Sequence, residues 1–328
     1  MPSAITGYLS EAVQFACGTL SVLWCLTMSL LYWFFNWFVG TLRLSTSTNL
    51  NGDVVVITGA GTGLGQEVAL QLAAKGCRLV LLGKVKNDLA RTMELLKANG
   101  VAESDVYTYG CDCSQEDCIR QTVEQIKTDL HGKVTVLVNN AGVVHPDHLD
   151  RLLSSDVHDT ISTNLLSHFW FTQALLPTLK RQPRAHIVCI GSVAGLFGAS
   201  GLSSYCASKF GVVGLCESLA MDLHRQGQHH VKVTCICPYH ISTKMFQGVE
   251  LRFPWLFPVL DVRYVGRRIV NCLFSERHLL VMPRTMYLLS FAKTILPYTV
   301  MLKAADFLGI TTAMESIETA AAAGRKYD

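Results

Sequence analysis

Three residues of the 328-residue chain have types and a spacing suited to proton transfer at a substrate oxygen. Tyr205 and Lys209 lie four positions apart, so on a helix they share one face. An ordinary phenol has a pKa of about 10, and a neighbouring ammonium lowers that pKa towards the range of a general acid or base. Ser192 ends an apolar run thirteen residues before the tyrosine, where its hydroxyl can donate to the same oxygen.

A glycine-rich turn, Thr58–Gly65, follows another apolar run and opens a helical pattern. Gly59, Gly63 and Gly65 let the backbone turn tightly and approach a pyrophosphate, which then lies at the helix N-terminus. Because the turn stands between a strand pattern and a helix pattern, it favours a dinucleotide site over a purely structural turn.

The end of the next apolar run indicates which dinucleotide is bound. Sites for NAD place an acid there to bond the ribose hydroxyls. This chain has Gly83 and Lys84 instead, with no carboxylate. Because Lys84 can pair with the 2′-phosphate of NADP, the sequence predicts NADP(H), with NAD(H) less favoured. The alternative is that Lys84 is a solvated loop residue.

Alternating elements would position these residues. Six short apolar runs are predicted to be buried parallel strands: Val54–Thr58, Arg78–Leu82, Val106–Tyr109, Thr135–Asn139, His186–Gly191 and Lys232–Cys237. Five segments have helical patterns: Gly65–Lys75, Val85–Ala98, Gln115–Leu130, Asp156–Lys180 and Ser203–His224. The alternation predicts an α/β fold of the Rossmann type, a doubly wound parallel sheet whose ligand lies beyond the carboxyl ends of its strands.

The C-terminal part of the chain is less regular. Val249–Val259 is predicted to be a bulky apolar loop. Four aromatic residues in or near it could wall an apolar pocket or pack in the core: Phe246, Phe253, Trp255 and Phe257. Leu279–Met301 is almost wholly apolar, but two bases and two prolines make it a poor span. It is predicted to lie on a membrane or to cover the pocket, with core packing and a dimer contact as the equal alternative.

The N-terminal part is predicted to be a membrane anchor. Ala12–Leu42 carries no charge over 31 residues, and its aromatic end is typical of a membrane–water interface. A cleaved signal peptide or a buried soluble helix fits the pattern less well. The anchor either crosses the membrane or forms a monotopic hairpin. Since the first base, Arg43, follows the run, the rest of the chain is predicted to face the cytosol.

Composition excludes several classes of protein. Half of the residues are apolar and 16% are charged, which excludes a disordered chain and a coiled coil. The net charge of +3 is too small for a nucleic-acid partner. The twelve cysteines include two C-x-C pairs, Cys111/Cys113 and Cys235/Cys237, which are predicted to be free core thiols and not metal ligands.

Three segments are predicted: anchor and linker 1–46, Rossmann domain 47–284 and apolar extension 285–328.

In their order, these motifs resemble those of the short-chain dehydrogenase/reductase family over roughly residues 53–282. The resemblance implies four catalytic residues: Asn164, Ser192, Tyr205 and Lys209. In such a site Asn164 holds a water that relays protons to Lys209, and Lys209 bonds the nicotinamide ribose. The resemblance also implies cofactor contacts from fourteen positions: Gly59, Gly63, Leu64, Gly65, Gly83, Lys84, Asp112, Asn139, Ala141, Gly142, Tyr205, Lys209, Ile241 and Thr243.

The chain is more closely similar to the membrane-anchored retinol dehydrogenases and retinaldehyde reductases, with 17β-hydroxysteroid-type relatives nearby. The anchor and three further segments carry this similarity: Val143–His145, Pro238–Gly248 and Arg252–Pro258. Two positions depart from the usual pattern. Tyr239 replaces the glycine of a Pro-Gly pair, and Thr62 stands where several NADP-preferring members have a base.

The similarity implies an NADP-dependent enzyme of the endoplasmic reticulum or lipid-droplet membrane that reduces retinaldehyde to retinol. Its expected partners are a lipophilic substrate, membrane lipid and a second copy in a homo-oligomer. A steroid or fatty aldehyde is the alternative substrate. The alternative function is a non-catalytic lipid-droplet or membrane protein, which an incomplete set of catalytic residues would favour.

Overall fold

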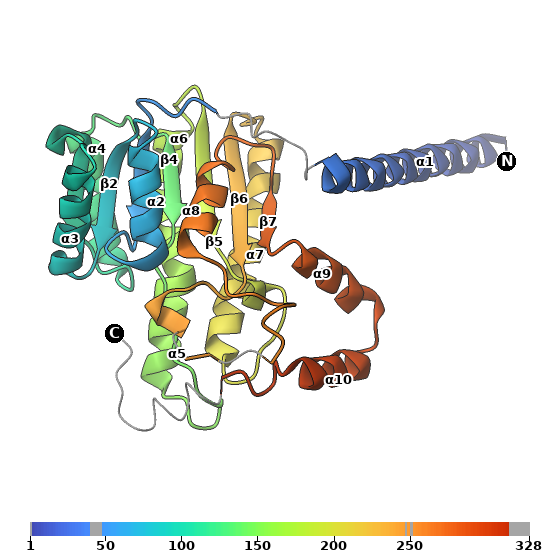
Figure 1. Cartoon of the computed structure of the whole chain (residues 1–328). Coiled ribbons are helices and arrows are strands. Elements are labelled where there is room, and N and C mark those ends of the chain that lie inside the picture. Colours follow the sequence, from blue (N-terminus) through green and yellow to red (C-terminus); the bar gives the residue numbers. More distant parts are fainter. Residues whose placement is uncertain (1, 40–47, 247, 250–251, 315–328) are drawn as a thin grey trace. The chain divides into compact units, whose positions relative to one another are not determined.

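The computed structural model describes residues 2–39, 48–246, 248–249 and 252–314, and the chain forms two compact units, Met1–Ser47 and Thr48–Asp328. The predicted boundary between residues 46 and 47 lies outside the described residues, as do residues 315–328 of the predicted C-terminal extension. The first unit contains α1 (Pro2–Val39), and the second contains the sheet and all other helices that the structure describes (Figure 1).

Helix α1 is continuous over 38 residues, which at 1.5 Å per residue is about 57 Å. Because Pro2–Val39 has no turn, a monotopic hairpin is not formed within it. Among the described residues, one helical stretch, Gln14–Tyr32, is long and apolar enough to cross a membrane, and none of it is buried within the structure.

The second unit is built on seven parallel strands in the spatial order β3-β2-β1-β4-β5-β6-β7. The strands are β1 (Val54–Thr58), β2 (Arg78–Gly83), β3 (Val106–Gly110), β4 (Val136–Asn139), β5 (Ala185–Ile190), β6 (Val231–Pro238) and β7 (Leu279–Met282). The order reverses between β1 and β4, and ligands of doubly wound sheets bind at this reversal.

Apolar side chains alternate between the two faces of the sheet, since successive strand residues point in opposite directions. Val55 and Ile57 of β1 join one core cluster with α2 (Gly63–Ala73), α3 (Lys86–Ala98) and α8 (Val262–Val270). Figure 1 shows α2 and α8 lying side by side on this face.

The other core cluster joins Val54 and Val56 to three helices on the opposite face: α4 (Glu116–Asp129), α6 (Ser167–Leu179) and α7 (Ser203–Arg225). With both faces covered by helices, the predicted Rossmann-type fold is confirmed.

The structure adds elements that the sequence patterns do not predict. Strand β7 and helix α8 are additional, and the apolar segment after β7 forms α9 (Thr285–Ile295) and α10 (Tyr298–Leu308). The helix predicted over Asp156–Lys180 is confirmed as one continuous helical stretch, made of α5 (Ser154–Ile161), a π-helical turn at Ser162–Leu166 and α6. The π turn itself was not predicted; it adds one residue to a single turn within the helix.

Candidate active site

The glycine turn after β1 forms a cradle that only a bare backbone fits. Gly59 and Gly63 have φ angles of +64° and +54°, a region that favours glycine. A Cβ at Gly65 would overlap the carbonyl oxygen of Gly59. Because α2 begins at Gly63, the free N–H groups of its first turn face the turn region, where they can hold an anion. These residues fit the pyrophosphate of a dinucleotide.

Side-chain hydrogen bonds join the ends of β1 and β4 beside this cradle. The Thr58 hydroxyl accepts from the N–H groups of Asn140 and Ala141 at 2.8 and 2.9 Å. The Asn140 amide donates to the carbonyl oxygens of Thr58 and Gly59 at 2.9 and 3.3 Å. Sequence reasoning missed Thr58 and Asn140 as site residues, although Asn140 lies between two residues that it predicted, Asn139 and Ala141.

Two predicted cofactor residues at the end of β4, Gly142 and Asn139, differ in whether they face the site. Gly142 lies between the cradle and the catalytic residues, since a Cβ there would be 3.4 Å from Asn164 Oδ1 and 3.8 Å from Lys209 Nζ. Asn139 is fully buried, and its amide donates to Thr172 Oγ1 at 3.2 Å. The structure therefore brings Gly142 into the site and turns the side chain of Asn139 into the core.

The ends of β2 and β3 supply an ion pair. Lys84 Nζ lies 2.9 Å from Asp112 Oδ2, and both side chains are accessible to solvent. The hydrogen bond to Asp112 raises the pKa of Lys84. Burial raises the pKa of Asp112, but Lys84 and the hydrogen bonds from Ser114 outweigh it, so the net pKa is lowered. Both groups are thus charged at neutral pH.

Three more residues that were predicted to contact the cofactor lie near the glycine turn or in the core next to it. Thr243 is next to Gly63, because a Cβ on that glycine would be 3.5 Å from the Thr243 methyl. Ile241 forms an isolated bridge with Leu260 and packs partly on the core. The Leu64 side chain is buried in the core, so only its backbone can face a ligand.

The π turn in the long helix presents Asn164 to the loop after β4. Asn164 Oδ1 accepts from the Val143 N–H at 2.7 Å, and its amide donates to the Val143 carbonyl at 2.9 Å and to Ser208 Oγ at 3.2 Å. The side chain is fully buried. π turns are frequent at functional sites. The side chain of Asn164 connects this turn to the loop after β4 and to α7 by hydrogen bonds.

Tyr205 and Lys209 lie on one face of α7, as their spacing predicts, and Ser192 is at the carboxyl end of β5. Lys209 Nζ lies 5.6 Å from the centroid of the Tyr205 ring and donates to the Ile190 carbonyl at 2.8 Å. Both side chains are buried. The residues predicted to be catalytic, Asn164 included, are therefore together at the carboxyl edge of the sheet.

Burial dominates the titration of this group. It raises the pKa of Tyr205 above its ordinary value, and the Ser192 side chain, which hydrogen-bonds the phenol, opposes that rise. Burial also lowers the pKa of Lys209 to about 8. The expected lowering of the phenol pKa by the ammonium is not what this structure has. Tyr205 is instead held as a neutral phenol at neutral pH, the form that donates a proton.

Two apolar segments cover Tyr205. The Phe246 ring meets the Tyr205 ring edge to face, with centroids 5.6 Å apart. Met314 belongs to the same buried cluster as Tyr205, Leu202 and Cys206. Sequence reasoning identified Phe246 as a pocket residue but missed Met314, because no local pattern links residues more than a hundred positions apart.

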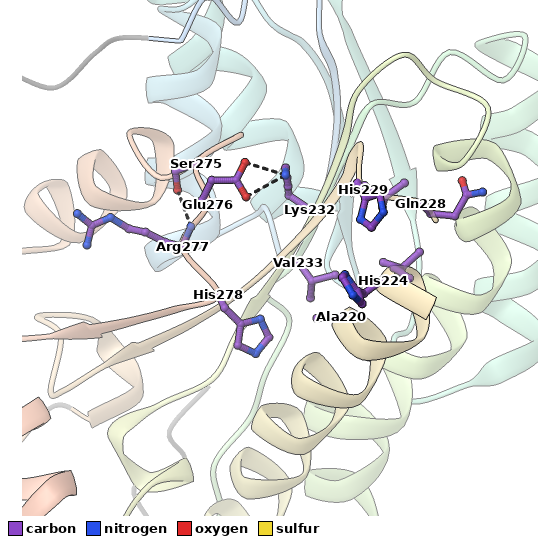
Figure 2. Close-up of a pocket in the computed structure, with 12 residues that line it drawn as sticks. Ala220, His224, Gln228, His229, Lys232, Val233, Ser275, Glu276, Arg277 and His278 are labelled. Atoms are coloured by element: carbon purple, nitrogen blue, oxygen red, sulfur yellow. Dashed lines mark hydrogen bonds and ion pairs between the residues drawn. The ribbon is translucent and has the colours of Figure 1, made fainter. Parts of the chain in front are cut away.

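An open cavity of about 200 Å³ lies at the amino ends of β6 and β7. Figure 2 shows Lys232 paired with Glu276 there, and His224 and His229 beside each other. None of the predicted site residues lines it. Within the described part of the chain, no three His, Cys, Asp or Glu side chains are arranged to hold a metal ion, and the two C-x-C pairs are buried free thiols.

Comparison with known families and curated proteins agrees with this geometry. The family model for short chain dehydrogenases matches residues 53–252. Epidermal retinol dehydrogenase 2 of Mus musculus is 38% identical over 262 residues, which cover 80% of this chain and 84% of the relative. Retinol dehydrogenase 10 of Homo sapiens is 34% identical over an alignment that covers 93% of this chain and 94% of the relative.

Solved structures of short-chain dehydrogenases have a similar fold. A short-chain dehydrogenase/reductase from Burkholderia phymatum in complex with NAD has a TM-score of 0.68 and 25% identity, covering 78% of this chain and 96% of its own. A short-chain dehydrogenase from Burkholderia cenocepacia J2315 in complex with NADP has a TM-score of 0.65 and 19% identity, covering 78% and 98%. The second likeness shows the fold alone.

Proposed function

Since the chain belongs to the short-chain dehydrogenase/reductase family, whose members act on CH–OH groups with a nicotinamide cofactor, we propose that it reduces retinaldehyde to retinol with NADPH at a membrane. One geometric observation carries the proposal: Tyr205 and Lys209 lie buried on one face of α7, and a Cβ on Gly142 of the loop after β4 would be 3.8 Å from Lys209 Nζ. The Tyr205 phenol keeps its proton at neutral pH, so it can donate that proton to a carbonyl oxygen.

The chain's residues divide the chemistry among them. The glycine cradle holds the pyrophosphate, and NADPH bound there supplies the hydride. Tyr205 donates its proton to the oxygen of the substrate carbonyl, and Ser192 stabilises that oxygen by hydrogen bonding. Lys209 orients the nicotinamide ribose. Asn164 holds a water molecule that relays protons to Lys209. In alcohol oxidation the same groups run in reverse.

Lys84 supports the choice of NADPH over NADH. It stands at the end of β2, where an NAD site has an acid, and its ammonium is exposed. Its partner Asp112 leaves part of the ammonium open to a second anion, because one ammonium donates up to three hydrogen bonds. A 2′-phosphate at this position therefore shares Lys84 with Asp112.

Two features support a lipophilic substrate and a membrane location. The cover over Tyr205 is apolar, and the relatives at 38% and 34% identity are named retinol dehydrogenases. The candidate span Gln14–Tyr32 tethers the chain where such substrates dissolve. We place the enzyme in the endoplasmic reticulum or lipid-droplet membrane with its catalytic unit in the cytosol.

The test is turnover of retinaldehyde by the purified full-length protein in detergent, with NADPH and with NADH. We expect faster reduction with NADPH, and faster turnover with NADH would refute the cofactor assignment. A steroid ketone and a fatty aldehyde in parallel test the substrate class. Tyr205→Phe should lower kcat by about 10²–10⁴-fold and keep NADPH affinity; unchanged cellular activity of this variant would favour a non-catalytic membrane protein.

A further inference from the structure

Helices α9 and α10 leave many large apolar side chains exposed to solvent. Each has 11 residues, and of these 22 only Met286 is buried. Figure 1 shows both helices outside the layers that cover the sheet, in the stretch that follows β7. Contiguous exposed apolar surface of this kind marks an interaction site.

Helix α9 has two distinct faces. Met286, Leu289 and Lys293 are spaced i, i+3 and i+7 and face the protein, where Met286 is in the core and Lys293 Nζ donates to the Leu196 carbonyl at 2.6 Å. On another face, Leu288 and Phe291 have the matching spacing and are 55% and 65% exposed. The inward face is attached to the segment that follows Ser192, and the outward face has no partner among the described residues.

Ring contacts extend this surface to the loop that contains Phe253 and Trp255. The Phe307 ring of α10 lies 5.4 Å from the Phe253 ring, and Phe253 lies 6.3 Å from Trp255, measured between centroids. Trp255 is 79% exposed. We call the exposed set the apolar rim: Trp255, Leu288, Phe291, Ile295, Leu296, Tyr298, Val300, Leu302 and Phe307.

The chemistry of the apolar rim fits a bilayer surface. Trp255, Tyr298 and the two phenylalanines are of the residue types that concentrate at the headgroup level. Residues 284–308 contain three bases and one acid. Lys293 faces the protein, and the other charges, Arg284, Lys303 and Asp306, leave a net +1 that complements anionic phospholipid. The candidate span at Gln14–Tyr32 is an independent feature that holds the chain at a membrane.

We propose that the apolar rim inserts into the headgroup–acyl boundary of an anionic phospholipid bilayer, as a second membrane contact in addition to α1. The rim is joined to the apolar cluster around Tyr205 by a short stretch of chain, because the segment that follows α10 contributes Met314 to that cluster. A lipophilic substrate therefore passes from the bilayer to the site beneath the rim. The passage of substrate rests on the proposed function, whereas the membrane contact does not.

The test uses the full-length protein in vesicles of phosphatidylcholine and phosphatidylserine that contain a phosphatidylcholine with a photoreactive diazirine on its acyl chain. After irradiation, labelled peptides are mapped by mass spectrometry. We expect label on peptides from residues 285–303 and around Trp255, as well as on α1. Label confined to α1, or rim peptides cross-linked to a second copy, would overturn the proposal.

Variants make the test specific. Phe291→Ser with Ile295→Ser should lower rim labelling severalfold and leave α1 labelling unchanged. The matched control is Leu95→Ser with Met221→Ser, which replaces two exposed apolar residues on helices outside the rim. This double variant should change neither the labelling of the rim nor the labelling of α1. Equal labelling of the rim in both double variants would contradict the proposal. Because labelling needs no turnover, it separates failure of the membrane contact from failure of the proposed retinaldehyde reduction.

Discussion

Asn164 and Val143 are joined by two opposed hydrogen bonds: the Val143 N–H donates to Asn164 Oδ1 at 2.7 Å, and the Asn164 amide donates to the Val143 carbonyl at 2.9 Å. One buried side chain thus satisfies both polar groups of a loop residue that has just left the sheet. The pairing holds the loop after β4 against the π turn, and so sets the distance between the cofactor loop and α7.

Asn164→Ala should weaken both folding and catalysis. It leaves the N–H and the carbonyl of Val143 without partners in a half-buried place, which costs up to about 1–3 kcal/mol for each group. We expect a free energy of unfolding lower by about 2 kcal/mol or more, and a kcat lower by about 100-fold. Denaturant unfolding and steady-state kinetics measure the two effects.

A second variant, at an exposed asparagine, tests whether these effects are specific to Asn164. Asn99 donates to the Leu95 carbonyl at 2.7 Å in an exposed place at the end of α3. Asn99→Ala should leave kcat unchanged and lower stability by less than about 1 kcal/mol. If the Asn164 and Asn99 variants behaved alike, the positioning role of Asn164 would be wrong.

The reduction should lose efficiency as pH rises through about 8. Burial lowers the pKa of Lys209 to about 8, so its ammonium loses its proton above that pH while Tyr205 stays neutral. If the ammonium orients the ribose, kcat/KM for reduction falls about tenfold per pH unit on the alkaline side. A profile of kcat/KM against pH checks this, and a flat profile up to the ordinary pKa of lysine would contradict it.

Lys84→Ala should reduce the preference for NADPH. Losing one exposed charge–phosphate contact is expected to raise the KM for NADPH by about tenfold, since charged hydrogen bonds contribute about 1.5–3 kcal/mol before solvent screening. The KM for NADH should change little. Lys97→Ala is the control, because Lys97 is in the last turn of α3 and pairs with Glu103. An unchanged ratio of the two KM values in the Lys84 variant would remove the structural basis for NADP.

Gly65→Ala should abolish cofactor binding by closing the cradle. The added Cβ would overlap the Gly59 carbonyl and lie 2.6 Å from the Asn140 amide nitrogen, so the turn must shift. Nicotinamide fluorescence titration should show no saturable binding. Gly214→Ala on α7 has open space around its Cβ and should raise stability by about 0.5–1 kcal/mol without affecting binding. Normal binding by the Gly65 variant would contradict the cradle.

The sequence by itself determined the parallel sheet, the glycine turn and the shared helical face of Tyr205 and Lys209. These depend on local periodicity and on short fixed spacings, and a single chain displays both directly. It also determined the apolar character of α1, because composition alone decides whether a helix can cross a membrane. It did not reveal β7, which opens the longer apolar segment Leu279–Met301 without a turn signal of its own, or α8, whose nine-residue pattern is short.

Only the tertiary structure decided which side chains meet. The π turn at Asn164, the bonds between Thr58 and Asn140, and the cover that Met314 forms over Tyr205 join residues from separate elements. The pKa of Tyr205 was decided in the same way. The sequence showed the ammonium four residues from the phenol, but burial, which depends on every segment packed around a group, is the largest cause of the raised pKa of Tyr205.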